Sequence, residues 1–245
     1  MISSRVPEAF TGPLSRAQIW ALQIWALIVA TVSLVGGCSH GQLVPAASAH
    51  LIPGAPTAAF DEQEGVRVSV NGDAWRGAPA DLAKRLTPVK VRLINHSGKP
   101  LQILYERFTM WGANGRRYRP LPVVPLDHDG ARATPLTPIF ANANFFVGPR
   151  YRDVYPSLES WSEPLQRDEA FYQHQYQLWG EGLPTTQMQR SALPEGVLGE
   201  GGEMSGYLYF ENATRDEDHL KFRAELDEAR GVDVVATIEV PFRVE

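Results

Sequence analysis

The residue with the clearest chemistry in this 245-residue chain is Cys38, its only cysteine. A deprotonated thiol is a nucleophile, and a lone thiol has no disulfide partner within the chain. Gly36 and Gly37 precede it, and two residues without side chains let an enzyme approach an extended backbone. Residues 17–35 before them carry no charge. This order suits covalent modification of a thiol that directly follows an apolar segment.

Residues 1–37 have the organisation of a secretory signal, with Arg5 and Arg16 ahead of the charge-free run and small residues at its end. The stretch Val35-Gly36-Gly37-Cys38 resembles the lipobox of bacterial lipoproteins. In that family the signal is cut before the cysteine, the thiol receives a diacylglycerol, and the new amino terminus is acylated. The resemblance implies a lipid on Cys38 and a membrane-anchored protein of the cell envelope.

The residue after the cysteine adds an expectation about location. In Gram-negative lipoproteins of this kind, aspartate at that position retains the protein in the inner membrane. This chain has Ser39 there, which favours the outer membrane.

Two other interpretations of the front of the chain remain open. Cys38 could be an inert small residue. Residues 17–35 could also be an uncleaved membrane helix, since about 20 apolar residues span a bilayer. Gln18 and Gln23 inside the run count against that helix.

The rest of the sequence contains no recognisable catalytic or metal-binding motif. The six histidines are scattered without an HExxH pattern, and Gly-x-Ser-x-Gly is absent. We therefore expect no enzymatic activity, no metal and no cofactor. An envelope hydrolase remains an alternative, because carboxylates such as Glu159 and Asp168 together with His174 could converge in the fold.

Aromatic residues gather between positions 151 and 179 and form the most informative remaining feature. Tyr and Trp dominate binding hot spots because they are rigid and amphipathic, and they also stack on sugars. The candidate binding residues are Trp161, Tyr172, Tyr176 and Trp179. The alternative is that these rings form a small core that fastens this region to the rest of the domain.

The elements that would position these residues are mostly strands. Apolar residues alternate with polar ones in 66–70, 89–93, 202–211, 219–229 and 233–244, which is typical of half-buried strands. A turn at residues 95–98 predicts that 103–111 returns as the partner of 89–93, and Asn114-Gly115 predicts a tight turn. Several short strands without βαβ alternation indicate a mostly β, antiparallel, immunoglobulin-like β-sandwich.

The predicted organisation has three parts. Residues 1–37 are the signal, and residues 38–64, rich in Ala, Pro and Ser, are a lipid-anchored flexible tether. Residues 65–245 are the sandwich, interrupted by a Pro- and aromatic-rich insertion at 121–182. Within the insertion we expect one helix over 168–179 that Asp168-Glu169 open. We expect a second helix shortly after the insertion, over TQMQRSAL, that Thr185 or Thr186 caps.

The segments PVKVRLINHSGKPLQILYERFTM and LPEGVLGEGGEMSGYLYFE look like those of uncharacterised bacterial lipoproteins with telokin-like, immunoglobulin-type domains. That resemblance implies an extracytoplasmic sandwich without known catalytic residues. The chain has 28 acidic and 23 basic residues and no basic cluster, which argues against nucleic acid as a partner. We expect a non-enzymatic interaction or scaffold module that binds an envelope protein, with binding of cell-wall glycan or peptidoglycan as the alternative.

Overall fold

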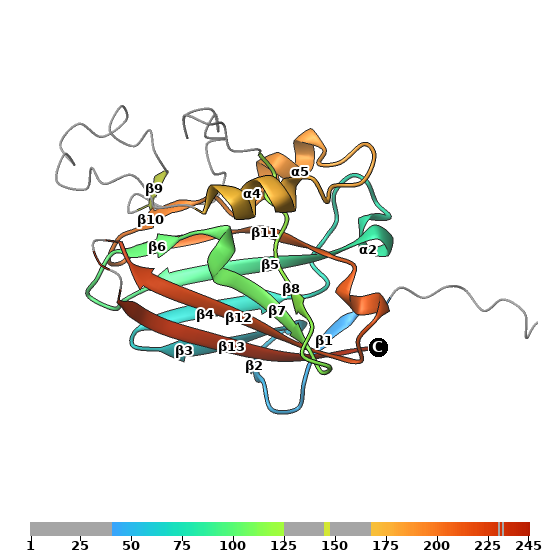
Figure 1. Cartoon of the computed structure of the whole chain (residues 1–245). Helices are drawn as coiled ribbons and strands as arrows, with labels where there is room; N and C mark the ends of the chain where they lie inside the picture. Colours follow the sequence, from blue (N-terminus) through green and yellow to red (C-terminus); the bar gives the residue numbers. More distant parts are fainter. Residues whose placement is uncertain (1–40, 125–144, 148–167, 230, 232) are drawn as a thin grey trace, which may run out of the picture. The chain divides into compact units, whose positions relative to one another are not determined.

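The computed structural model describes residues 41–124, 145–147, 168–229, 231 and 233–245. In this part of the chain the strands form two antiparallel sheets that face each other (Figure 1). The larger sheet has the order β1-β13-β12-β6-β10-β9, with β7 paired to β12 and β8 paired to β7. The smaller sheet has the order β11-β5-β4-β3-β2. The predicted antiparallel β-sandwich is confirmed, and the immunoglobulin type stays a prediction.

The strands of the larger sheet are β1 (Leu43–Pro45), β6 (Leu101–Ile103), β7 (Phe108–Gly112), β8 (Arg117–Tyr118), β9 (Phe145–Val147), β10 (Gly196–Leu198), β12 (His219–Glu228) and β13 (Val234–Val244). Those of the smaller sheet are β2 (His50–Ile52), β3 (Ala55–Gln63), β4 (Val66–Asn71), β5 (Leu86–Asn95) and β11 (Glu203–Glu211). The described helices are α2 (Leu82–Arg85), α4 (Glu169–Tyr176) and α5 (Thr186–Ser191), with 3₁₀ turns η1 (Tyr105–Arg107) and η3 (Ala213–Arg215).

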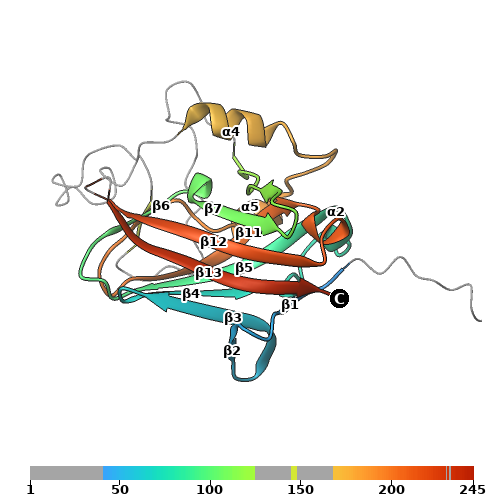
Figure 2. The ribbon, with the colours of Figure 1, turned by 60° about the horizontal axis from the view of Figure 1, so that its bottom comes forward.

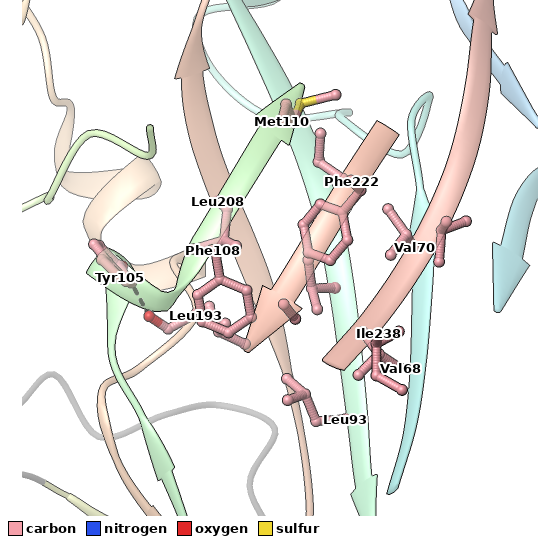
Figure 3. Close-up of a cluster of buried hydrophobic side chains, with 14 of the residues drawn as sticks. Val68, Val70, Leu93, Tyr105, Phe108, Met110, Leu193, Leu208, Phe222 and Ile238 are labelled. Atoms are coloured by element: carbon pink, nitrogen blue, oxygen red, sulfur yellow. Dashed lines mark hydrogen bonds between the residues drawn. The ribbon is translucent and has the colours of Figure 1, made fainter. Parts of the chain in front are cut away.

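The core lies between the two sheets and follows from the period-two patterns. Alternate side chains of β4 and β5 meet those of β7, β12 and β13, and Figure 3 shows Val68, Leu93, Phe108, Phe222 and Ile238 pointing into this space. All five side chains are fully buried. Burial of a Val, Leu, Ile or Phe side chain contributes about 1.5–3 kcal/mol. Packing of these strands is therefore the main source of stability in a domain without disulfides.

The predicted hairpin between residues 89–93 and 103–111 is wrong. β5 pairs with β4 and β11, whereas β6 and β7 belong to the other sheet. The side chain of buried Asn95 explains the crossover, because its Nδ2 donates to the carbonyls of Lys99 at 2.7 Å and Leu198 at 3.0 Å. These bonds turn the chain from the smaller sheet toward β10 of the larger one. The turn at Asn114-Gly115 does join β7 and β8, as predicted.

The predicted tether over residues 38–64 is also wrong for the residues that the structure describes. Residues 43–45, 50–52 and 55–63 are β1, β2 and β3. Leu43 and Ala59 are buried in the main core, and β3 pairs with β4 along six residue pairs. The Ala- and Pro-rich composition hid these strands because small side chains give little hydrophobic periodicity.

The chain also bridges the two sheets at both edges of the sandwich. On one side, the carboxylate of Asp61 in β3 accepts a hydrogen bond from the Glu239 N–H in β13 at 3.3 Å. On the other side, Tyr118 pairs with β7, and three residues later the Leu121 N–H donates to the Tyr209 carbonyl of β11 at 2.7 Å. Both contacts protect strand edges that would otherwise expose unpaired backbone groups.

A buried carboxylate holds the β7–β8 hairpin. Glu217 is 7% exposed and accepts hydrogen bonds from the Tyr118 hydroxyl and the Ala113 N–H, each at 3.1 Å. Burial, and secondly the bond to Glu217, raises the pKa of Tyr118 to about 12. The folded domain therefore keeps this phenol neutral at pH values where an exposed tyrosine ionises.

This shift predicts a loss of stability in alkali. An unfolded tyrosine ionises near pH 10, whereas Tyr118 in the fold ionises near pH 12. Below pH 10 both states hold the proton and the stability is unaffected, so the unfolding free energy should fall as pH rises from about 10 to about 12. Urea unfolding between pH 9 and 12 should give a shallower fall for Tyr118→Phe than for wild type. Parallel curves would contradict this assignment.

Candidate functional site

Both predicted helices form, one within the insertion and one just after it, and local capping explains why. Asp168 precedes α4, and its Oδ1 accepts a hydrogen bond from the Phe171 N–H at 3.1 Å. Thr185 precedes α5 in the same way, with its Oγ1 accepting from the Met188 N–H at 3.2 Å. A side-chain oxygen at this position satisfies one of the free N–H groups of a helix start. The carboxylate of Asp168 therefore has a structural role at the start of α4.

A cluster of aromatic rings covers the outward face of β11. Leu208 and Phe210 of this strand point into the main core, so Tyr207 and Tyr209 point away from it. Trp75 contacts both tyrosine rings edge-on, with centroid distances of 5.1 Å to Tyr207 and 5.8 Å to Tyr209. Edge-to-face pairs at such distances are favourable. These rings form the centre of a second core, here called the outer cluster, of Trp75, Leu82, Leu86, Leu121, Val123, Met188 and Tyr209.

Trp179 of the insertion joins this outer cluster. Its ring lies 6.0 Å from that of Tyr209, and its indole N–H donates to the Pro122 carbonyl at 2.7 Å. Two other rings are fixed in the same way. The Tyr209 hydroxyl donates to the Met188 carbonyl at 3.1 Å, and the Trp75 indole donates to the Pro79 carbonyl at 3.0 Å. Burial raises the pKa of Tyr209, so its hydroxyl is a hydrogen-bond donor over the physiological pH range.

Polar side chains attach α5 to the segment before α2. The Ala78 N–H donates to Gln187 Oε1 at 2.8 Å, and the Thr185 hydroxyl donates to the Ala78 carbonyl at 3.2 Å. Gln189 Nε2 donates to the Val123 carbonyl at 3.3 Å. Backbone groups around positions 78 and 123 are thus satisfied by side chains of one short helix. The helix that follows the insertion is therefore fixed to the sandwich.

Tyr172 attaches α4 to the main core. Its side chain is 1% exposed, and its hydroxyl donates to Glu195 Oε1. The same carboxylate oxygen accepts the Tyr105 N–H at 2.7 Å, and the Tyr105 hydroxyl donates to the Leu193 carbonyl at 2.8 Å (Figure 3). One carboxylate therefore links α4, the turn η1 and the segment before β10.

We expect Tyr172→Phe to lower the unfolding free energy by about 1–2 kcal/mol, since a hydrogen bond to a charged group contributes about 1.5–3 kcal/mol and the ring is retained. Amide hydrogen exchange should also show that α4 loses protection more than β5 does. A matched control is Tyr176→Phe, on the same helix and only half-buried, which should change neither quantity measurably. Unchanged exchange of α4 in Tyr172→Phe would contradict the role given to Glu195.

These positions bear directly on the predicted binding residues. Tyr172 is buried and Trp179 is half-buried with its N–H bonded, so packing accounts for both without a partner. Tyr176 is half-buried, and Trp161 lies outside the described residues. Their role in binding stays a prediction. The alternative, that these rings form a small core that fastens the region to the rest of the domain, fits Tyr172 and Trp179. Glu159 of the hydrolase alternative is also outside the described residues.

Sequence reasoning missed Trp75, Tyr207 and Tyr209 as parts of one cluster. The signal was present in the stretch Tyr-Leu-Tyr-Phe at 207–210, because both alternating positions hold large apolar side chains. Such a pattern is typical of a strand that is buried on both faces. No local sequence pattern, however, identifies Trp75 or α5, which contains Met188, as the elements that cover the outward face of β11.

The outer face of the larger sheet is different, because it is charged and open. Its strands carry ion pairs between Lys221 and Glu239 at 2.8 Å and between Arg223 and Glu225 at 2.6 Å. Arg117 lies over the ring of Trp111, with 4.0 Å from its guanidinium carbon to the ring centroid. Exposed pairs of this kind contribute about 0–1 kcal/mol, so this face adds little to the stability of the fold.

Searches of the described residues for two further kinds of site were negative. No group of three or more His, Cys, Asp or Glu side chains is arranged to hold a metal ion. Across the same residues, no helix combines the length and the apolar character needed to span a bilayer. Comparison with known proteins likewise gives no match to a family model, a curated protein or a solved structure.

Proposed function

We propose that this chain is a lipid-anchored, non-enzymatic interaction module of the bacterial cell envelope. The observation that supports it best is the sequence around Cys38: a lone thiol after two glycines and a charge-free run. The structure adds support of a different kind, because ordered strands begin within a few residues of that cysteine. An anchor at Cys38 would therefore be attached directly to a folded domain.

The test of the anchor is chemical. Cells that express the full chain are fed a fatty acid with a terminal alkyne, and the protein is then isolated and coupled to a fluorescent azide. The proposal predicts a labelled band for wild type and for Ser39→Ala, which keeps the thiol. It predicts no labelled band for Cys38→Ser, which has nearly the same shape but cannot form the thioether. Equal labelling of all three proteins would overturn the proposal.

Location in the outer membrane belongs to the same proposal and has its own test. The expectation depends on Ser39, the residue after the thiol. Membranes are separated by density, and the protein is followed in each fraction. Wild type should sediment with the outer membrane, and Ser39→Asp should move to the inner membrane. A protein that stays in the inner membrane in both forms would contradict the outer-membrane assignment.

We assign partner binding to residues 148–167, the part of the insertion between β9 and α4, which contains Trp161. Deleting all of 121–182 would remove Leu121, Val123 and Tyr172, which are buried. A sharper variant replaces only residues 148–167 with a Gly/Ser segment of equal length. Wild type should retain envelope protein, and the replaced variant should not. Retention of purified cell-wall sacculi by wild type alone would favour the glycan alternative, and equal capture by both would overturn the role of the insertion.

A further inference from the structure

The first described residues are fixed firmly to the end of the chain. The Gln42 N–H donates to the Glu245 carbonyl at 2.8 Å, and the Glu245 N–H donates back to the Gln42 carbonyl at 3.0 Å. Gly41 is packed so closely that a β-carbon there would lie 2.2 Å from Val244 Cγ1 and 2.8 Å from the Thr214 carbonyl oxygen. The folded domain therefore begins at Gln42 at the latest.

This start leaves a very short connection to Cys38. Three residues separate Cys38 from Gln42, and the four residue-to-residue steps between them span about 13–14 Å when fully extended. A lipid on Cys38 would therefore hold Gln42 within about that distance of the membrane surface. The connection is too short for the domain to turn over freely, since β12 alone, with ten residues, is about 33 Å long.

The strand registers identify which end of the sandwich this connection holds. Val44 pairs with Arg243 of β13, and Arg243 also pairs with His219, the first residue of β12. Leu220 then pairs with Gly112 at the end of β7. The start of β1, the C-terminus, η3 and the β7–β8 turn therefore share one end, which lies at the right in Figure 1. We call it the β1 end.

The opposite end carries β9, a described strand within the insertion. Glu228 at the end of β12 pairs with Leu101 of β6, and β6 pairs with β10. β10 pairs in turn with β9, the described strand between residues 124 and 168. Figures 1 and 2 both show β6 at the end far from β1. We call it the β9 end.

We propose that the β1 end of the sandwich lies directly on the lipid surface and that the β9 end projects away from it. This inference rests on the proposed lipid on Cys38. The partner of the β1 end is the phosphate headgroup layer that carries the anchor. The β9 end, where Val147 leads into the 148–167 segment, then lies about 30 Å from the membrane, as set by the length of β12.

Charges at the β1 end suit this placement. Arg116 pairs with Asp216 at 3.1 Å and Arg243 pairs with Glu245 at 2.5 Å, so these charges are balanced locally. Arg117 and Arg215 are exposed, and within the described part of the chain neither is paired with a carboxylate. Exposed basic side chains next to a membrane are attracted to anionic headgroups. Asp218 is also exposed there, so the attraction is modest and the short connection determines the orientation.

The experiment uses the one-cysteine sequence. The acylated Cys38 thiol cannot react, so an introduced cysteine is the only site for a thiol-reactive fluorophore. Ala113→Cys places the fluorophore in the β7–β8 turn of the β1 end, and Ala229→Cys places it just after β12 at the β9 end. Both replace an alanine outside the strands. The full chain is purified from membranes and reconstituted into vesicles of phosphatidylethanolamine and phosphatidylglycerol with a quencher on the headgroups.

We expect several-fold stronger quenching of the fluorophore at position 113 than at position 229. Inserting 12 Gly/Ser residues between Ser39 and His40 gives a connection with a root-mean-square length of about 22 Å and should abolish the difference. Thermal unfolding of each labelled protein verifies that the fold is intact.

The outcomes separate the two proposals. The mass of the N-terminal peptide shows whether the reconstituted protein is lipidated. A Cys38 peptide without the added mass of the lipid overturns both the proposed function and this orientation. A lipidated protein with equal quenching at both positions overturns the orientation alone. A difference that persists after the 12-residue insertion would show that the β1 end binds lipid by itself, and it would overturn the short connection as the cause.

Discussion

Gly206→Ala should destabilise the domain by about 3 kcal/mol, the upper part of the range for forced overpacking. Gly206 is buried in β11, and residues 192–193 run alongside this strand through a parallel bridge between Ala192 and Tyr207. A β-carbon at this position would lie 2.4 Å from both the N and the Cα of Leu193. These are backbone atoms, so no side-chain rotation relieves the contact. Relief requires separating the two segments, which weakens the 2.8 Å hydrogen bond from the Leu193 N–H to the Tyr207 carbonyl.

Thermal unfolding measures this effect directly. For a domain of this size, 1 kcal/mol corresponds to about 2–4 °C, so the midpoint should fall by about 10 °C. The matched control is Gly231→Ala, where the nearest heavy atom to a β-carbon is the Asp233 nitrogen at 3.8 Å. That substitution should change the unfolding free energy by less than about 0.5 kcal/mol. Equal unfolding midpoints for the two variants would show that the backbone of Leu193 does not pack against Gly206 as described.

Cys38→Ala should abolish the lipid-anchored, processed form of the protein completely, because no thiol remains to form the thioether. A protein carrying two or more acyl chains stays on a bilayer, because each buried CH₂ contributes roughly 0.8 kcal/mol. We therefore expect the processed, membrane-bound form to be absent from this variant.

Fractionation in carbonate at high pH measures how much processed protein stays with the membrane. Wild type should stay in the pellet, and it should move to the detergent phase when the membrane is dissolved. The variant should be soluble, or should be retained with an uncut N-terminal segment whose larger mass is visible on a gel. The control Ser39→Ala, one residue further on, should behave as wild type. A Cys38→Ala protein that stays in the pellet with the mass of the processed form would contradict lipid anchoring.

The sequence predicted well those strands that have one buried and one exposed face. Strands β11, β12 and β13 were expected at 202–211, 219–229 and 233–244, and they lie within one residue of those bounds. Their alternation is strong because buried residues such as Phe222 and Ile238 alternate with charged ones such as Arg223 and Glu239. Capping chemistry predicted the start of α4 equally well, since Asp168 is its N-cap residue.

Long-range pairing could not be predicted in the same way. β5 pairs with β11 across more than 100 residues, and no local pattern indicates that partner. The stretch 103–111 was expected as one strand, but η1 interrupts it so that β6 pairs with β10 and β7 pairs with β12. The strand β3 escaped detection because its buried residues Ala58 and Ala59 are small and adjacent, which removes the period-two signal.

The error at residues 38–64 changes the functional account most. A flexible tether would hold the domain tens of ångströms from the membrane in any orientation. The observed β1, paired with β13 from Leu43 onward, places a fold five residues after Cys38, the proposed lipid site. The candidate site changes in a similar way, because Tyr172 and Trp179 pack against Glu195 and Tyr209 and so fix the base of the insertion. The proposed role in partner recognition therefore rests on the segment 148–167, which contains Trp161.

The most direct test of the central claim is the mass of the N-terminal peptide of protein extracted from membranes. After digestion, the account predicts a peptide that begins at Cys38 and carries the mass of a diacylglycerol and an amide-linked acyl chain. The same peptide from Cys38→Ser should lack these additions. An unmodified Cys38 inside an intact N-terminal segment would contradict the lipid anchor, and with it the placement of the sandwich on the membrane.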